Sequence, residues 1–235
     1  MKLLIVTYLD KIDRTSKRLR DSAKKYKVNL EICGIDMKYK IHNNIKIKWM
    51  KSYFDEKGDQ EKTIILFMDG NDTEISKNFR DKKIIKYFER YNCDILLSTG
   101  SECKKTNGDY FLKYKMRIKK DKYWNFFNLR DNKCFNNGVI VGHYNKVRDY
   151  VNIMNDYYNR NDPRFKKLEL KHKNSTGDQL LLLYLASKTR LLDHIKFNCD
   201  NKKKISYAYD SENNELPKIQ KLLIWHNQWF KSNLK

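Results

Sequence analysis

Two carboxylates three residues apart are the strongest chemical signal in the sequence. Asp69 and Asp72 follow the apolar segment 63–68 in the string ILFMDGNDTE, and Gly70 allows a tight turn between them. Both side chains can converge on one hard cation, and a divalent metal neutralises a nucleoside diphosphate as it leaves a sugar. A solvent-facing turn is the alternative, because Asp, Gly and Asn are the usual turn residues. The pair therefore suggests a metal site, and the interpretation depends on whether other residues could complete it.

Polar residues elsewhere at strand ends could complete such a site. The segment LLIWHNQ runs into His226, whose neutral imidazole is a candidate third metal ligand, although a lone His is more often structural. In CFNNGVIVG, the amides of Asn136 and Asn137 could hold sugar hydroxyls, and Gly138 would allow close approach of a ligand. A β-bulge is the other interpretation of this interruption.

A third polar group opens an apolar helix. Gly177, Asp178 and Gln179 directly precede the run 180–186, which is apolar on nearly every face and is expected to be buried. Asp178 either caps this helix or faces a substrate, and capping is the usual role of such an Asp.

Alternating apolar patterns indicate the elements that must position these residues. We expect strands at 3–6, 28–33, 63–68, 94–98 and 134–141, with short strands near 195–197, 205–208 and 222–225. Helices are expected up to residue 26 and over 46–56, 76–91, 147–154 and 180–186, with a long polar loop reaching residue 132. The order predicts one α/β domain with a mixed, mostly parallel sheet, whose ligands bind beyond the carboxyl ends of the strands.

Composition restricts the class of protein. The chain has 235 residues and a net charge of +21, with the lysines spread along it rather than gathered in a nucleic-acid-binding motif. We therefore expect no specific nucleic-acid binding, although a basic surface attracts polyanions in general. Five cysteines lack the paired spacing of a zinc or redox motif, and no segment is apolar for long enough to be a signal peptide or a membrane span. The expectation is a soluble cytoplasmic protein with no membrane partner.

The order of motifs resembles the glycosyltransferase domain of the procollagen lysyl hydroxylases. The resemblance covers nearly the whole chain, and it is carried by nine short strings in sequence. They are KLLIVTY, RLRDSAKKY, KIKWMK with FMDGNDTE, STGSE, CFNNGVIVG, GDQLLLLYL, and LDHIKF with the closing IWHNQ. Single strings are weak signals, whereas their common order is fairly specific.

This resemblance implies a GT-A-type Rossmann-like fold, a UDP-hexose donor and Mn²⁺. It implies a nucleotide-sugar-binding half over residues 1–100 and an acceptor-side half over 101–235. Asp69, Asp72 and His226 would bind the metal, and Asp178, Asn136 and Glu102 would face the transferred sugar or the acceptor. Residues along the donor would be Thr7, Tyr8, Lys46, Asp69, Asn71, Asp72, Asn137, Gly138, Gln179, Asn227 and Lys231.

The favoured hypothesis is a metal-dependent transferase of glucose or galactose from UDP, of the hexosyltransferase class. Its expected acceptor is hydroxylysine, or galactosyl-hydroxylysine, in a collagen-like protein. A transferase of surface or capsid glycans, as in a giant virus or microbe, is the second hypothesis, located in host cytoplasm or virion if the protein is viral. A basic nucleic-acid-binding domain is the third. A homodimer is left open.

Overall fold

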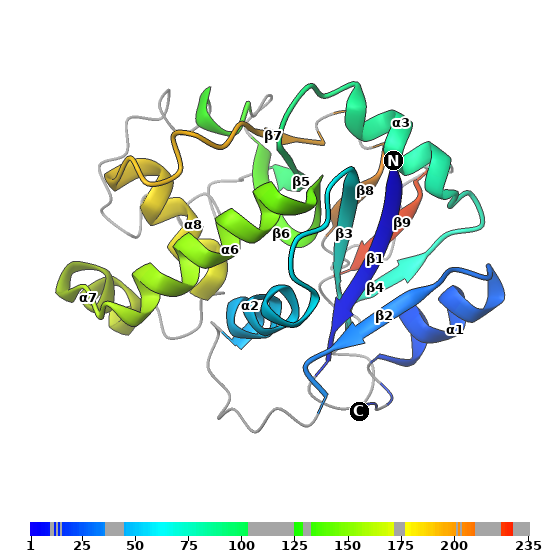
Figure 1. Cartoon of the computed structure of the whole chain (residues 1–235), viewed down its shortest axis with the longest axis horizontal. Helices are drawn as coiled ribbons and strands as arrows, with labels where there is room; N and C mark the ends of the chain where they lie inside the picture. The colour runs from blue at the N-terminus through cyan, green and yellow to red at the C-terminus, as the bar shows by residue number, and fades with distance from the viewer. Residues whose placement is uncertain are drawn as a thin grey trace.

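A computed structural model gives the structure of the chain (Figure 1). It describes residues 1–9, 12, 14, 16–35, 45–102, 125–128, 133–171, 177–200, 202, 204–209 and 222–227. The strands are β1 (Lys2–Tyr8), β2 (Leu30–Cys33), β3 (Thr63–Asp69), β4 (Thr73–Ile75), β5 (Ile95–Glu102), β6 (Lys133–His143), β7 (Phe197–Cys199), β8 (Ser206–Tyr209) and β9 (Ile224–Asn227). The helices are α1 (Lys17–Lys25), α2 (Ile45–Lys57), α3 (Asp81–Glu89), α6 (Tyr144–Asn159), α7 (Pro163–Lys171) and α8 (Gly177–Lys188).

The strands of the described segments form one mixed sheet. Its order is β2-β1-β3-β6-β5-β8-β9-β4, and β7 pairs with β5 beside that path. Most neighbours are parallel, but β6 runs antiparallel between β3 and β5, and β4 is antiparallel to β9. The expected α/β fold with a mixed, mostly parallel sheet is therefore confirmed. Because β1, β3 and β5 point the same way, their carboxyl ends share one edge of the sheet.

The two faces of the sheet bury separate sets of apolar residues. Alternation along β3 sends Ile65 and Phe67 to one face and Ile64 and Leu66 to the other. Helices α2, α6 and α8 cover the first face, called here the α2/α6/α8 face, whereas α1 and α3 cover the second, called the α1/α3 face. Figure 1 shows these two groups of helices on opposite sides of the central strands.

Local packing explains why two sequence expectations were wrong. The helix expected over 76–91 begins only at Asp81, because the preceding segment is tied to β9. The Ser76 N–H donates to Leu223 O at 3.0 Å, and its hydroxyl donates to Leu222 O. Antiparallel pairing with β9 creates the short strand β4, which is too brief to show a period in the sequence. Helix α7 was also not expected.

No helix within the described ranges is long and apolar enough to cross a bilayer.

Candidate functional site at the carboxyl edge of the sheet

The ends of β1 and β3 bring the first polar side chains together. Tyr8 and Asp69 are paired in register, and the Tyr8 hydroxyl donates to Asp69 Oδ1. Thr7, one residue earlier, is fully buried and its hydroxyl donates to Met68 O at 2.8 Å. That hydroxyl is therefore engaged inside the sheet, so any part that Thr7 plays at a nucleotide is indirect. Of Thr7 and Tyr8, it is Tyr8 whose hydroxyl reaches Asp69 at the carboxyl edge of the sheet.

The turn between Asp69 and Asp72 packs against β1 and does not stand in solvent. A Cβ at Gly70 would lie 2.2 Å from Leu9 Cδ2 and 2.7 Å from Tyr8 O, so only glycine fits here without movement. The Thr73 hydroxyl donates to Asp69 O and closes the turn from its far side. Asp72 is half-buried, and its Oδ1 is covered. This packing disfavours the interpretation of the DGND string as an ordinary surface turn.

Lys46, in the first turn of α2, joins three parts of the fold. Its Nζ lies 2.9 Å from Asp69 Oδ1 and 3.6 Å from Asp178 Oδ2, and it donates to Asn137 O in β6. The Lys46 side chain is 10% exposed, and those of Asp69 and Asp178 are 24% and 12% exposed. A cation at a helix N-terminus is unfavourable by itself, and the two carboxylates offset that cost. Lys46 thus connects Asp69, a candidate metal ligand, to Asp178 at the start of α8.

Three acidic side chains and one basic side chain meet at this edge. Burial lowers the pKa of Lys46, and the negative charges of Asp178 and Asp72 oppose that effect. Asp69, Asp72 and Asp178 together present three carboxylates to this one ammonium group. Carboxylate oxygens gathered in this way are the type of ligand that divalent cations such as Mg²⁺ and Mn²⁺ take in proteins.

The interrupted strand around Asn136 is a β-bulge, as the second interpretation held. Pairing between β5 and β6 shifts register between Leu97 and Ser98, which face Ile140 and Asn136. Asn136 Oδ1 accepts the Gly138 N–H at 2.7 Å, and the Ser98 hydroxyl donates to Asn136 O at 2.9 Å. The amide oxygen of Asn136 is therefore used to hold the bulge, which limits its freedom to contact a sugar.

Asn137 differs from its neighbour because its amide has no strong partner. The side chain is 3% exposed, and neither Oδ1 nor Nδ2 makes a close hydrogen bond in the described part of the chain. The hydroxyl of Tyr150 on α6 interacts with this amide. Burial and the charge of Asp178 raise the pKa of Tyr150, while the Asn137 amide works against that rise. A buried amide without full partners fits a group that receives a ligand.

The start of α8 faces the cluster through Asp178. This residue lies within the first turn of the helix, where a negative charge is favourable, and not at the capping position before it. Its neighbour Gln179 donates from Nε2 to Phe135 O at 2.9 Å and so ties α8 to β6. The structure therefore favours Asp178 facing the site over Asp178 as a cap, and it gives Gln179 a supporting contact.

Two residues that sequence reasoning missed also line this region. Trp49 on α2 packs its ring 5.6 Å from that of Tyr8, and its indole N–H has no hydrogen-bond partner among the described residues. The string KIKWMK was noticed, but a buried Trp on a helix is usually core. The spacing of Tyr150 on α6 is that of an ordinary core residue, so the sequence did not mark it as a site residue.

The structure describes the other predicted site residues only in part. The backbone of His226 lies opposite Thr73 in the pairing of β4 with β9, which puts it beside the residue that follows Asp72. Asn227 ends β9, and Glu102 ends β5, again with only the backbone described. Asn71 lies half-buried in the turn. Lys231 lies outside the described residues.

The side chains present fit a divalent metal only in part. Carboxylate oxygens are suitable ligands for Mn²⁺ or Mg²⁺, and Asp69 and Asp72 supply them. Within the described ranges, no three His, Cys, Asp or Glu side chains gather closely enough to hold a metal by themselves. The backbone register of β9 keeps His226 as the predicted third protein ligand.

A solved structure shares the fold. The structure is similar to the crystal structure of a glycosyltransferase involved in the glycosylation of the major capsid of PBCV-1, with a TM-score of 0.58 and 12% identity. The match covers 96% of this chain and 93% of that one, and it shows the fold. A second solved structure, A197 from STIV, matches at a TM-score of 0.35 and 11% identity, covering 62% of this chain and 66% of that one, which is too distant to inform the fold.

Family membership follows from the sequence. Residues 1–216 match the family model of the PLOD GT domain. The chain therefore belongs to the PLOD GT domain family and is a glycosyltransferase. No curated protein matches the sequence significantly.

Proposed function

We propose that this glycosyltransferase moves glucose or galactose from a UDP-sugar to a hydroxyl acceptor with the help of Mn²⁺. The observation that carries the proposal is the convergence of the Asp69, Asp72 and Asp178 carboxylates around Lys46 at the carboxyl edge of the sheet. A divalent cation held by Asp69, Asp72 and His226 would neutralise charge on the departing diphosphate. The family to which the chain belongs supports this donor chemistry.

The residues of the chain have distinct parts in the proposed reaction. In the transfer, the bond from the anomeric carbon to the diphosphate oxygen breaks and the acceptor oxygen bonds to that carbon. The acceptor also loses a proton, and Asp178 is the described carboxylate outside the proposed metal pair that could accept it. Lys46 would hold Asp178 and Asp69 at a fixed separation, and Asn137 would offer its amide to sugar hydroxyls.

The aromatic pair of Tyr8 and Trp49 would form the nucleotide side of the site. Asn71 has no ring to stack on a uracil, whereas the half-buried Tyr8 ring stands at the edge of the sheet. The Lys46 ammonium lies 5.1 Å from the centre of that ring and so restrains it. Replacement of Tyr8 by Ala should raise KM for the donor more than it lowers kcat.

UDP release across a donor panel, with Mn²⁺ and with EDTA, tests enzyme class and donor together. We expect release from UDP-glucose or UDP-galactose only with the metal, and loss of at least 100-fold in Asp69→Asn or Asp72→Asn. Asp55→Asn is the matched control, because Asp55 pairs with Lys51 on the exposed side of α2. Direct Mn²⁺ titration by electron paramagnetic resonance provides a readout independent of turnover. Full activity in EDTA would refute the metal assignment.

The acceptor is the second question. Hydroxylysine or galactosyl-hydroxylysine in collagen-like protein is the first candidate, in accord with the family. The solved structure that shares the fold is named for glycosylation of a viral major capsid, and this favours a surface or capsid glycan as the second candidate. A transfer assay with collagen-like peptides and with oligosaccharides, read by mass spectrometry of the product, separates the two. Activity in neither would leave donor hydrolysis alone and would reject both acceptors.

A further inference from the structure

Charge is distributed unevenly between the two faces of the fold. Residues 14–27, which include α1, contain seven basic residues and one acidic residue, and residues 77–90, which include α3, contain six and two. These 28 residues therefore carry a net charge of +10, close to half of the total of +21. The 50 residues of α2, α6, α7 and α8 together carry only +5. The proposed transfer reaction uses none of the charge around α1 and α3.

The cations around α1 and α3 point outward. Both helices bury their apolar sides, with Leu19 and Ala23 on α1 and Ile84 and Phe88 on α3, in the same core beneath the sheet. Every basic residue of the two segments is exposed except Arg20, which is half-buried. They are Arg14, Lys17, Arg18, Arg20, Lys24, Lys25, Lys27, Lys77, Arg80, Lys82, Lys83, Lys86 and Arg90. These residues form what is called here the basic face.

We propose that the basic face binds the surface of an anionic membrane without inserting into it. In Figure 1, α1 and α3 lie well apart along the same side of the molecule, so their cations are spread over an area and not along a line. A bilayer surface can meet cations of both helices at once, whereas a nucleic acid duplex touches a broad face only along a strip. Clusters of basic residues on a helix are a known basis for attraction to anionic headgroups.

The side chains around the cations also favour a purely electrostatic contact. Lys25 lies 5.4 Å from the ring centre of Tyr26, and Arg90 lies 6.0 Å from that of Tyr87, so a cation stands over one face of each ring. Neither α1 nor α3 carries an exposed large hydrophobic residue that could enter the acyl layer. The sequence contains no long apolar segment, which is why no membrane partner was expected. A contact made through charge does not require such a segment.

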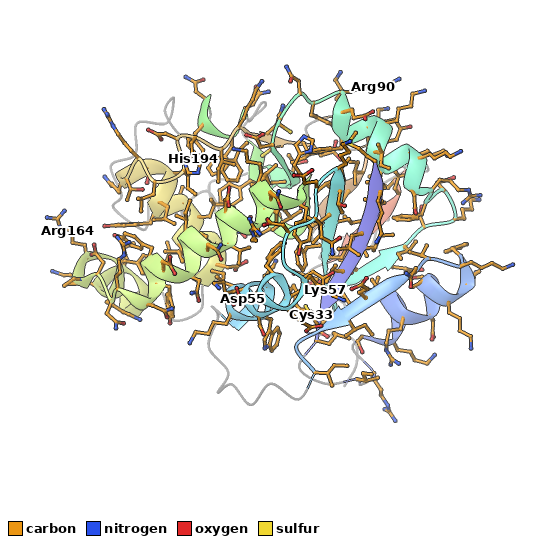
Figure 2. All side chains as sticks on the ribbon, in the orientation of Figure 1. Cys33, Asp55, Lys57, Arg90, Arg164 and His194 are labelled. Carbon is orange, nitrogen blue, oxygen red and sulfur yellow. The ribbon has the colours of Figure 1, made fainter. Side chains whose placement is uncertain are left out.

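The consequence for the enzyme is one of orientation. The site is built by the carboxyl ends of β1 and β3 together with α2 and α8, and none of these elements contributes to the basic face. Figure 1 shows α7 and α8 on the side of the sheet away from α1 and α3, and Figure 2 shows Arg164 on α7 at the left end of the molecule. A membrane bound through the basic face therefore leaves α7 and α8 turned away from it. This inference does not depend on the donor or the metal.

Co-sedimentation with vesicles tests the proposal on the intact chain. We expect binding to phosphatidylcholine vesicles that contain phosphatidylserine, no binding to pure phosphatidylcholine, and steep loss of binding as salt is raised. The triple variant Arg18→Gln, Lys24→Gln, Lys25→Gln should weaken binding on the order of 100-fold, from about fivefold per charge. Neutralising Lys82, Lys83 and Lys86 to Gln on α3 should have a similar effect.

A matched triple variant on the other helices serves as the control. Arg164, Lys167 and Lys188 are exposed on α7 and α8, and their change to Gln removes the same charge. If this variant loses vesicle binding as much as the α1 variant does, net charge and not the basic face is responsible, and the proposal fails. It also fails if duplex DNA at equal phosphate concentration and salt binds more tightly than the vesicles. UDP release should be unchanged in all three variants, so loss of membrane binding and loss of catalysis are separable.

Discussion

The two faces of the sheet use basic residues in opposite ways. On the α2/α6/α8 face, Lys46 is buried and placed between carboxylates of β3 and α8. On the α1/α3 face, the lysines stand in solvent, and the pair of Lys17 with Asp21 has both side chains more than half exposed. A buried charge is costly unless it is paired, whereas exposed pairs contribute little. The comparison teaches that net charge alone does not identify the functional lysine in a basic protein.

Removal of the buried ammonium should have the largest effect. Lys46→Met leaves Asp69 and Asp178 without their common partner, so we expect the free energy of unfolding to fall by about 3–5 kcal/mol. UDP release should also fall by at least 100-fold at temperatures where the variant stays folded. Chemical denaturation monitored by circular dichroism, together with the donor assay, measures both effects.

The matched controls for this change are two surface lysines. Lys17→Met and Lys51→Met each break an exposed pair between residues four apart on one helix, and each should cost less than about 1 kcal/mol. Equal losses in Lys46→Met and Lys51→Met would contradict the distinction between the two kinds of lysine.

Truncation of one buried leucine on each face should separate stability from activity. Leu19 on α1 and Leu181 on α8 are both fully buried, so each change to Ala should destabilise the fold by about 2–5 kcal/mol. Only Leu181→Ala should lower kcat, because α8 also positions Asp178. Thermal unfolding and steady-state kinetics below the melting range test this. Loss of kcat in Leu19→Ala at full folding would show that the α1/α3 face supports catalysis.

A methyl group at Gly70 should act locally on the site. The added Cβ meets Leu9 and the Tyr8 carbonyl, so Gly70→Ala should cost about 1–3 kcal/mol and move the turn that carries Asp69 and Asp72. Mn²⁺ affinity should therefore weaken. Gly58→Ala is the control: Gly58 has open space around it but a φ of +67°, so its change should cost about 1 kcal/mol and leave the metal affinity as it was.

One thiol on each face has a raised pKa, although Cys33 is half-buried and Cys93 is buried. Cys33 packs against the α2/α6/α8 face, near Lys57 in Figure 2, and Cys93 lies in the core of the α1/α3 face. Burial raises the pKa of each thiol to about 12 from an ordinary value of 9.0. Both should resist iodoacetamide at pH 9 in the folded protein and react once it is unfolded, as measured by mass spectrometry of each cysteine.

The same raised pKa values give a small dependence of stability on pH. Below pH 9 the thiols are protonated in the folded and in the unfolded chain, so their contribution to stability is fully present. Between pH 9 and 12 the unfolded chain loses these protons while the folded chain keeps them, so stability should fall as pH rises. Cys33→Ser and Cys93→Ser should each flatten this slope.

Much of the fold was predictable because its signals are local. The continuous apolar run 63–68 ends at Asp69 in the sequence and in β3, and the alternation of strands and helices predicted the α/β class correctly. The DGND turn was also visible from residue types. Strand β4 and helix α7 were missed, because a three-residue strand has no period and α7 has no clear apolar stripe.

The sequence by itself determined the apolar periods, the position of Asp69 at a strand end and the order of motifs that marks the family, since each depends on neighbouring residues only. Tertiary structure alone decided which polar atoms remain available. Hydrogen bonds within the sheet occupy the Thr7 hydroxyl and the Asn136 amide oxygen. The Asn137 amide makes no close hydrogen bond to a described residue. Tertiary structure also placed Lys46 against Asp178 from the far half of the chain. Such pairings depend on packing between distant segments, and no local pattern encodes them.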